Sequence, residues 1–278
     1  MCGTDSKPLL MTSPRLIEAQ MQDTLHTRMP RTLHMHDDRV EILLIRRGEG
    51  IHIIGGQTYL TKAGDILIFD VNVLHDEYAV QNSGLEILSC SIGNLSLRGL
   101  SPNQLLPSGA SPVLHDGWCR HEAEALMTMI CAAGIEPQKI SPEILRHLLS
   151  SLVLLIHQAG VRSAQAVPTA EYEVGRAIQS YVDQHYMEDI SIASISEAMR
   201  FGESYLSHAF KNATGYSIRQ YIIRRRIGEA QSWLLMSGLS ITDIALKVGY
   251  NSVSNFHNTF RRVVGMSPQQ YRDYWKEI

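Results

Sequence analysis

The sequence predicts two domains of different fold class, an N-terminal all-β domain followed by two helices and a C-terminal all-α domain with two helix-turn-helix units. The length of 278 residues suits two domains of average size. Short β-rich runs separated by glycine or asparagine turns fill residues 31–95, whereas helical patterns dominate from residue 171 onward. The composition, 44% hydrophobic and 19% charged, excludes collagen-like, disordered and membrane classes.

The β-rich region contains six runs of strand-forming residues at regular spacing. These predicted strands cover residues 40–46, 51–54, 57–60, 66–69, 75–80 and 85–92. Gly55-Gly56 between two of them is typical of a two-residue hairpin turn. Such spacing predicts a sandwich or a barrel, which we assign to residues 26–96. Residues 1–25 are predicted to form an N-terminal arm.

Residues 97–160 are predicted to form a helical extension of the β domain. A loop rich in Ser, Pro and Gly comes first, and apolar residues then recur at helical spacing in two segments. The second segment carries Val153, Leu154 and Leu155 in addition to one apolar face. This surplus fits either burial against the β domain or a seam between two copies of the chain. Residues 161–170 lack periodicity and are predicted to be a linker to residues 171–278.

The C-terminal domain contains an internal repeat. Residues 192–211 and 241–261 each consist of a short helix, a tight turn with glycine, and a second helix that ends in phenylalanine plus a basic residue. In the second helices, the pairs Leu206/Phe210 and Phe256/Phe260 have the i, i+4 spacing of an inward face. Small polar residues remain on the outside, as expected of helices that contact base edges.

The segment between the repeats, residues 218–236, is predicted to be one long helix. Its length of about 28 Å is close to the ~34 Å of one DNA turn. Two recognition helices held this far apart could enter successive major grooves. Lys211, Arg261 and Arg262 are the predicted phosphate contacts.

The distribution of charge agrees with a polyanionic partner. Residues 190–272 contain ten basic and four acidic residues, a net charge of +6, and because the whole chain carries −3 the remainder carries −9. A basic block on an acidic body favours binding to nucleic acid, although a solvated helical surface has the same appearance.

Residues 174–272 resemble the DNA-binding domain of the AraC/XylS family of bacterial transcription regulators. The second unit carries the family pattern at Arg226, Ala230, Leu234, Leu235, Ser240, Ile241, Asp243, Ile244, Ala245, Gly249, Tyr250, Ser252, Phe256, Phe260, Gly265, Ser267, Pro268, Tyr271 and Arg272. The first unit departs from the pattern at Ser196, where the family usually has Ala, and Gly228 lies inside the connecting helix at a cost of ~1 kcal/mol relative to Ala. The resemblance assigns base contacts to Ser204, Tyr205, His208, Val253, Ser254 and Asn258.

The β domain contains a second set of functional candidates, His34, His36, Glu41 and His75. The pattern H-x-H-x4-E, followed by G-D-x9-H, resembles the three-histidine, one-carboxylate set of the cupin barrel. Three interpretations remain open: hydrogen bonds to a polar effector such as a sugar, coordination of a divalent metal, or side chains that satisfy backbone groups at the rim. The resemblance to AraC-like regulators favours a metal-free sugar site. His26, His52, His115 and His121 have no such grouping and are predicted to be surface or core residues.

The sequence thus predicts a transcription regulator controlled by a small effector, with double-stranded DNA as partner and no resident cofactor. We expect a homodimer and, if the protein is an activator, contact with RNA polymerase. The alternative is a metal-dependent cupin enzyme or metal sensor with an appended DNA-binding domain. No phosphate loop and no nucleophile motif support an enzyme. Four widely spaced cysteines and the absence of a signal peptide or bilayer-length apolar stretch predict a cytoplasmic protein without membrane contact.

Overall fold

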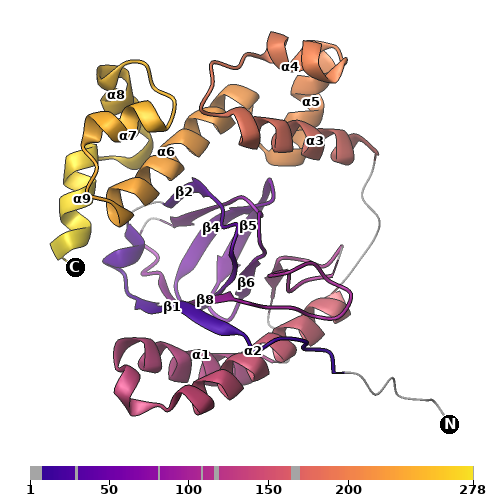
Figure 1. Ribbon diagram of the computed structural model, residues 1–278, viewed down its shortest axis with the longest axis vertical. Helices are drawn as coiled ribbons and strands as arrows, with labels where there is room; N and C mark the ends of the chain where they lie inside the picture. The colour runs from indigo at the N-terminus through magenta and orange to yellow at the C-terminus, as the bar shows by residue number, and fades with distance from the viewer. Residues whose placement is uncertain are drawn as a thin grey trace.

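The computed structural model describes residues 8–28, 31–80, 82–107, 109–115, 119–163 and 170–277. Figure 1 shows a central β domain with α1 and α2 on one side and the long helix α6 on the other. Residues 1–7 of the predicted arm and residues 164–169 of the predicted linker lie outside the described residues. The two predicted fold classes are confirmed.

The β domain consists of two antiparallel sheets. One has the strand order β1-β8-β3-β6-β9 and the other β2-β7-β4-β5. The strands are β1 (Arg15–Gln22), β2 (Arg31–His34), β3 (Arg39–Arg47), β4 (Glu49–Ile54), β5 (Gln57–Lys62), β6 (Ile66–Phe69), β7 (His75–Ala79), β8 (Glu86–Gly93) and β9 (Val113–Leu114). They include all six predicted strands, with ends that differ by a few residues.

Strand β1 differs from the prediction of an arm up to residue 25. Arg15–Gln22 pairs with β8 along its length, from Arg15 opposite Gly93 to Gln22 opposite Ile87. Its residues are mostly half-buried or exposed, because β1 is an edge strand, and this weak hydrophobic signal explains why the sequence did not reveal it.

Strand β3 shows how alternation positions the site. Successive side chains of a strand point to opposite faces. Val40, Ile42 and Leu44 therefore belong to the core beneath α1 and α2, whereas Leu43 and Ile45 belong to the core between the sheets. Glu41 has the same parity as the second group and points into the interior.

Helices α1 (Arg120–Ile135) and α2 (Pro142–Ser163) cover the outer face of the first sheet. Leu152, Val153 and Ile156 of α2 are fully buried in that core, so burial accounts for much of the apolar surplus. By length and hydropathy alone α2 could cross a membrane, but buried core helices have the same composition. Leu154 remains exposed.

The C-terminal domain contains both predicted helix-turn-helix units. Its helices are α3 (Ala170–His185), α4 (Ile192–Met199), α5 (Glu203–Thr214), α6 (Ile218–Met236), α7 (Ile241–Lys247), α8 (Val253–Val264) and α9 (Pro268–Glu277). Helices α4 and α5 form the first unit, α7 and α8 form the second, and α6 connects them.

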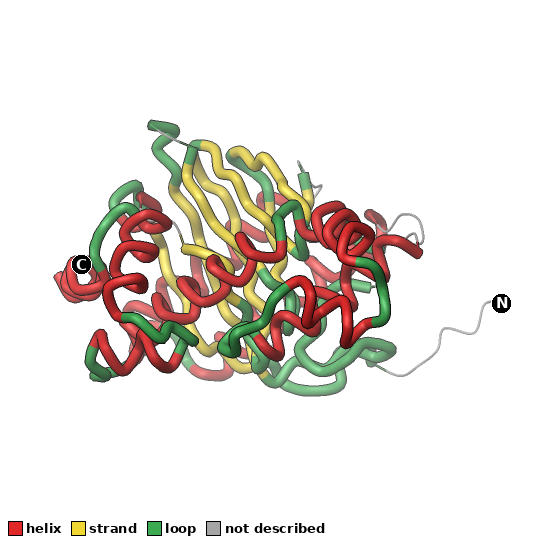
Figure 2. The backbone as a smooth tube through the Cα atoms, turned by 90° about the horizontal axis from the view of Figure 1, so that it is seen from above, coloured by secondary structure: helices red, strands yellow, loops and turns green. Residues whose placement is uncertain are grey.

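Gly228 lets α6 approach strand β2 closely. A Cβ atom at this position would lie 2.1 Å from the carbonyl oxygen of Leu33 and 2.6 Å from that of Thr32. Close by, the backbone N–H of Thr32 donates to Gln231 Oε1 at 3.0 Å. Figure 2, seen from above, shows helices that cross the strands of the β domain. The glycine predicted to weaken the helix thus has a packing role between the domains.

Candidate effector pocket and DNA-binding surface

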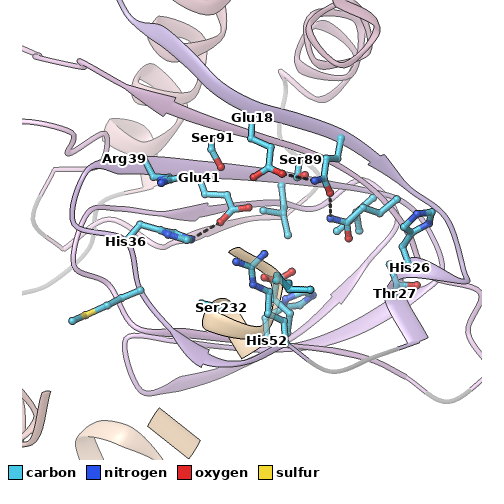
Figure 3. Close-up of a pocket in the computed structure, with 18 of the residues that line it drawn as sticks. Glu18, His26, Thr27, His36, Arg39, Glu41, His52, Ser89, Ser91 and Ser232 are labelled. Carbon is cyan, nitrogen blue, oxygen red and sulfur yellow. Dashed lines mark hydrogen bonds and ion pairs between the residues drawn. The ribbon is translucent and has the colours of Figure 1, made fainter. Parts of the chain in front are cut away.

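A cavity of about 530 Å³ lies between the two sheets. Its size is in the range of pockets that hold small molecules. Many of its lining side chains are polar and come from both sheets, as Figure 3 shows. They include Glu18, Gln20, Gln22, Thr27, Arg31, His36, Glu41, His52, Glu77, Ser89 and Ser91.

His36 and Glu41 line this cavity, and the other two predicted residues, His34 and His75, join them in one cluster. One ligand-type atom from each of His34, His36, Glu41 and His75 lies within 4.8 Å of the others. His34 on β2 is the register partner of His75 on β7, and Glu41 reaches them from β3 of the opposite sheet. His36 Nε2 lies 3.3 Å from Glu41 Oε2. Three of the four are buried and His36 is half-buried.

Burial and neighbouring charges determine the protonation of this cluster. Burial lowers the pKa of His34 well below its usual value, and the charge of Arg31 adds to the effect. Burial also lowers the pKa of His75 to about 3, against the opposing charge of Glu41. Burial alone would raise the pKa of Glu41, but the hydrogen bond from His36 and the charge of Arg31 lower it to about 2. Near neutral pH the cluster therefore presents two neutral imidazoles, His34 and His75, beside an ionised carboxylate.

Sequence reasoning missed several polar residues of the cavity. His52, predicted to be a surface or core residue, is buried, lines the cavity, and has no hydrogen-bond partner for either ring nitrogen within the described parts of the chain. Burial lowers its pKa to about 4. Burial and the charge of Glu41 raise the pKa of Glu77 to about 8. The local sequence contains no signal that identifies His52, because the buried positions of β4 are 50, 52 and 54, whereas its apolar residues are Ile51, Ile53 and Ile54.

The other ungrouped histidines fit the prediction better. His115 and His121 are exposed, and His115 Nδ1 lies 3.1 Å from Asp65 Oδ1. His26 is half-buried, also lines the cavity, and contacts Asp23 Oδ1 at 2.7 Å.

The DNA-binding domain supplies one wall of the cavity. Glu229, Ser232 and Met236 of α6 line it together with Tyr271 and Trp275 of α9. A ligand in the cavity would therefore touch both domains. This shared wall depends on how the domains pack and has no signature in the local sequence.

The predicted DNA contacts lie on the outer faces of α5 and α8. Eight of them are exposed, and Val253 is half-buried. The exposed residues are Ser204, Tyr205, His208, Lys211, Ser254, Asn258, Arg261 and Arg262. The inward residues Leu206, Phe210, Phe256 and Phe260 are fully buried, which fixes the orientation of both helices.

Some basic residues counted for DNA serve the fold instead. Arg224 contacts Asp76 Oδ2 of the barrel at 3.0 Å, and Arg225 is buried beside Glu229 and Asp183. Arg226 donates to the carbonyl oxygens of Tyr186 and Glu188. Arg272 does the same for Leu234 and Leu239. The exposed positive charge is thus smaller than the sequence count implies.

Two family models match this chain and together cover most of it. The AraC-like ligand binding domain matches residues 17–153, and a helix-turn-helix domain matches residues 195–274. The chain belongs to the AraC family of transcription regulators. The first model begins inside β1, in agreement with the place of this strand in the barrel.

Relatives of this AraC-family chain match it over most of their length. The uncharacterized HTH-type transcriptional regulator YdiP of Escherichia coli is 27% identical over 87% of this chain and 81% of its own. The HTH-type transcriptional activator RhaR of Yersinia pseudotuberculosis is 25% identical over 95% and 94%. These relatives are transcription regulators and not enzymes, which disfavours the alternative of a cupin enzyme with an appended DNA-binding domain.

The complete fold also occurs in a solved structure of the AraC family. ToxT from Vibrio cholerae, bound to an unsaturated fatty acid, has a TM-score of 0.54, 15% identity, and coverage of 97% of this chain and 96% of that one. At this identity the likeness concerns the fold, including the association of a barrel with two helix-turn-helix units.

Proposed function

We propose that this AraC-family regulator senses a hydroxyl-rich small molecule, most simply a sugar, in the barrel cavity. The observation that carries the proposal is the polar lining of that cavity. Carboxylate, amide, hydroxyl and imidazole groups face the same space. Glu18, Gln20 and Ser89 come from the first sheet, and His52 and Glu77 come from the second. Such groups can pair with the alternating donors and acceptors of sugar hydroxyls.

The aromatic side chains at the cavity wall support the same class of ligand. Tyr271 and Trp275 offer apolar ring surface beside the polar groups. Pockets that bind small molecules commonly combine apolar surface with a few directed polar groups. A fatty acid, the ligand in the ToxT structure, would leave many of the buried polar groups here without partners, at a cost of ~1–3 kcal/mol each.

We propose that α5 and α8 enter successive major grooves of double-stranded DNA. Ser204, Tyr205, His208, Val253, Ser254 and Asn258 would face base edges, and Lys211, Arg261 and Arg262 would contact phosphates. Their exposure on the outer faces of the two helices supports this assignment.

Effector occupancy would change DNA binding through the shared wall of the cavity. A ligand shifts an equilibrium only if it binds one arrangement more tightly than another. Because α6 and α9 line the cavity, the effector would contact the DNA-binding domain only while that domain is docked on the barrel. This gives the ligand a direct differential affinity for the docked arrangement.

Three further assignments belong to the proposal. A homodimer would use the exposed surface of α2, where Ile144, Leu154 and Val161 are exposed apolar side chains.

Relatives that are named activators support activation and therefore contact with RNA polymerase. The protein would act in the cytoplasm, where it meets its DNA, with no membrane partner.

The test is a thermal-shift series on the full chain against mono- and disaccharides, after removal of metal with a chelator. A saturable rise in melting temperature is expected for one sugar, about 2.7 kcal/mol of stabilisation at a hundredfold excess over Kd. The double variant Ser89→Ala/Ser91→Ala, which removes two cavity hydroxyls, should weaken the response, whereas Ser150→Ala on α2 should not. A response to fatty acids alone, or equal responses in both variants, would contradict the proposal.

A further inference from the structure

We infer that the effector of this regulator carries a protonated amino group, which Glu18 and Glu77 bind inside the barrel cavity. For the rest of the ligand the inference rests on the proposed function, because a hydroxyl-rich molecule with one ammonium group is an amino sugar. The charge of the ligand is argued from the lining of the cavity alone.

The first argument is the excess of acidic side chains in the cavity. The guanidinium groups among its described lining residues are those of Arg31 and Arg39. The carboxylates of the same lining are more numerous and belong to Glu18, Asp37, Asp38, Glu41, Glu77 and Glu229. A cleft lined by charges of one sign concentrates ligands of the opposite sign. The cavity therefore favours a cation.

The existing ion pairs leave this excess in place. Arg39 Nε lies 2.6 Å from Asp38 Oδ1, so one of the two guanidinium groups already has its partner. Glu229 Oε2 lies 3.0 Å from Arg225 Nη1, a group outside the cavity lining. Arg31 is then the guanidinium group of the described lining that remains for the carboxylates of the interior.

Arg31 lies among those carboxylates and cannot balance all of them. It is the register partner of Glu77 on the neighbouring strand. Burial alone would lower the pKa of Arg31, but the charges of Glu41 and Glu77, with a smaller effect of Glu18, raise it. One cation thus serves three carboxylates. A ligand ammonium group beside Glu18 and Glu77 would supply the second positive charge.

The second argument is the unpartnered imidazole of His52. This side chain is 1% exposed and lines the cavity, and among the described residues neither of its ring nitrogens has a hydrogen-bond partner. His52 on β4 is the register partner of Glu77 on β7. Figure 3 shows Glu18 on one side of the cavity and His52 on the opposite side. Buried polar atoms are rarely left unsatisfied, so His52 indicates that a polar ligand group belongs here.

The acceptors of these three residues match the donors of an ammonium group. Burial lowers the pKa of His52 to about 4, so near neutral pH its ring is neutral and one nitrogen carries a lone pair. A primary ammonium group has three N–H donors and no acceptor. The carboxylates of Glu18 and Glu77 and the lone pair of His52 would accept from it.

The third argument is the aromatic surface at the same wall. Tyr271 and Trp275 of α9 line the cavity, with ring centroids 6.3 Å apart. Burial raises the pKa of Tyr271 to about 12 against the charge of Arg31, with a smaller contribution from Glu77, so Tyr271 lies within electrostatic reach of both residues. The faces of aromatic rings attract ammonium groups. An amino group bound here would therefore connect the acidic barrel wall to the DNA-binding domain.

The experiment is isothermal titration calorimetry of the full chain with matched sugars, slightly below neutral pH. The probes are glucosamine, galactosamine and mannosamine, each beside its neutral parent hexose and its N-acetyl derivative, which lacks the charge. One amino sugar is expected to bind about tenfold or more tightly than both of its uncharged counterparts, because only the ammonium group pairs with the buried carboxylates.

The variants Glu18→Gln and Glu77→Gln keep side-chain volume and remove one charge each. Both should reduce the preference for the amino form to about threefold or less and leave the affinity for the neutral hexose nearly unchanged. Glu143→Gln, at an exposed acidic residue of α2, is the matched control and should bind like the parent chain. Circular dichroism of each variant shows that it is folded.

The outcomes separate this inference from the proposed function. Neutral hexoses that bind as tightly as the amino sugars would overturn the inference and leave the sugar sensor intact. An equal preference for the amino form in the parent and in both glutamine variants would overturn the assignment to Glu18 and Glu77. A simple diamine such as putrescine is the last probe. If it binds and no sugar does, the proposed function is wrong, whereas the cation site is supported.

Discussion

The two helix-turn-helix units share one pattern but differ in what completes their cores. The core of the second unit is built from its own helices and the connector, with Leu234, Ile244, Phe256, Phe260 and Tyr271 among its buried residues. The core of the first unit contains Leu33 and Leu74 of the barrel beside its own Phe210 and Tyr221 of the connector α6. The first unit is therefore packed partly by the effector domain, and the second is complete in itself.

The turns between the two helices of each unit also differ, in the residue that takes the left-handed conformation. In the second unit Gly249 occupies the left-handed position at φ +91°, and the next residue, Tyr250, is buried. In the first unit Arg200 occupies the left-handed position at φ +58°, and the next residue, Phe201, is exposed. A non-glycine residue in this conformation costs roughly 1 kcal/mol or more.

The starts of the recognition helices differ as well. Ser252 caps α8 by accepting a hydrogen bond from the N–H of Asn255, whereas Gly202 starts α5 without a side-chain cap. The comparison teaches that an effector signal has a direct route into the first unit, through the barrel residues in its core. We expect the second unit to hold its shape, and its DNA contacts, largely independently of the barrel.

The largest expected effect comes from Leu33→Ala. Leu33 is 1% exposed, and loss of a buried leucine side chain costs ~2–5 kcal/mol. Amide hydrogen exchange should accelerate in α3, α4 and α5 and remain slow in α7 and α8. Leu234→Ala, at a position buried in the second core, should give the reverse pattern. Equal acceleration of both units in either variant would show that the cores are not separate.

A pH-dependent effect of similar or smaller size is expected at Asp183, which accepts hydrogen bonds from Tyr221 of α6 beside the core of the first unit. Burial raises the pKa of Asp183 from 3.8 to about 6, against the charge of Arg225. The folded state thus binds this proton more tightly than the unfolded state. The contribution to stability is present below pH 4 and is lost as the pH rises toward 6, by up to ~3 kcal/mol.

The measurement is the free energy of unfolding of the parent and of Asp183→Asn between pH 4 and 7. As the pH rises over this window, the free energy of unfolding of the parent should fall relative to that of Asp183→Asn. The corresponding tyrosine of the second unit, Tyr271, has Gln231 as a neighbour, which does not titrate. A pH-independent difference would refute the assignment of the raised pKa to Asp183.

Gly228→Ala should push α6 away from β2 and lower the free energy of unfolding by ~1–3 kcal/mol, the usual range for overpacking. The added methyl would meet the backbone of β2, which cannot rotate away. The gain of ~1 kcal/mol in helix propensity offsets only part of this. Urea denaturation measures the change, and Gly238→Ala, where no atom lies within 4 Å of the added Cβ, is the control. A more stable Gly228→Ala chain would mean that α6 does not need this close approach.

The smallest effects concern the two turns. Arg200→Gly should relieve the left-handed strain and stabilise the chain by ~1 kcal/mol or less. Gly249→Ala should destabilise it by more than that, because the added Cβ would also lie 2.5 Å from the carbonyl oxygen of Met187. Melting temperatures of the two variants test the contrast, and the same sign for both would contradict it.

Local patterns predicted much of this molecule. The β-rich runs between glycine or asparagine turns and the spacing of Leu206/Phe210 and Phe256/Phe260 are local, and they correctly indicated the barrel strands and the inward faces of α5 and α8. The four-residue cluster was found through the resemblance of its spacing to the cupin pattern, and the structure brings the four side chains together.

The remaining features depend on tertiary contacts. Arg31, Glu77 and His52 line the cavity only because the two sheets face each other, and Trp275 does so only because α9 docks beside them. Gly228 appeared to be a defect of the connecting helix, since nothing in the sequence indicates which surface the helix meets. Edge strand β1 was missed because half-buried edges have weak periodicity.

The shared wall of the cavity has a consequence for chimeric regulators. Tyr271 and Trp275 lie in the final helix of the chain, far in sequence from the barrel, yet they complete the pocket. A hybrid that joins this barrel to the DNA-binding domain of another regulator would receive foreign side chains at that wall. Ligand selectivity would then change along with operator choice, so the two halves of this protein are not independent modules for engineering.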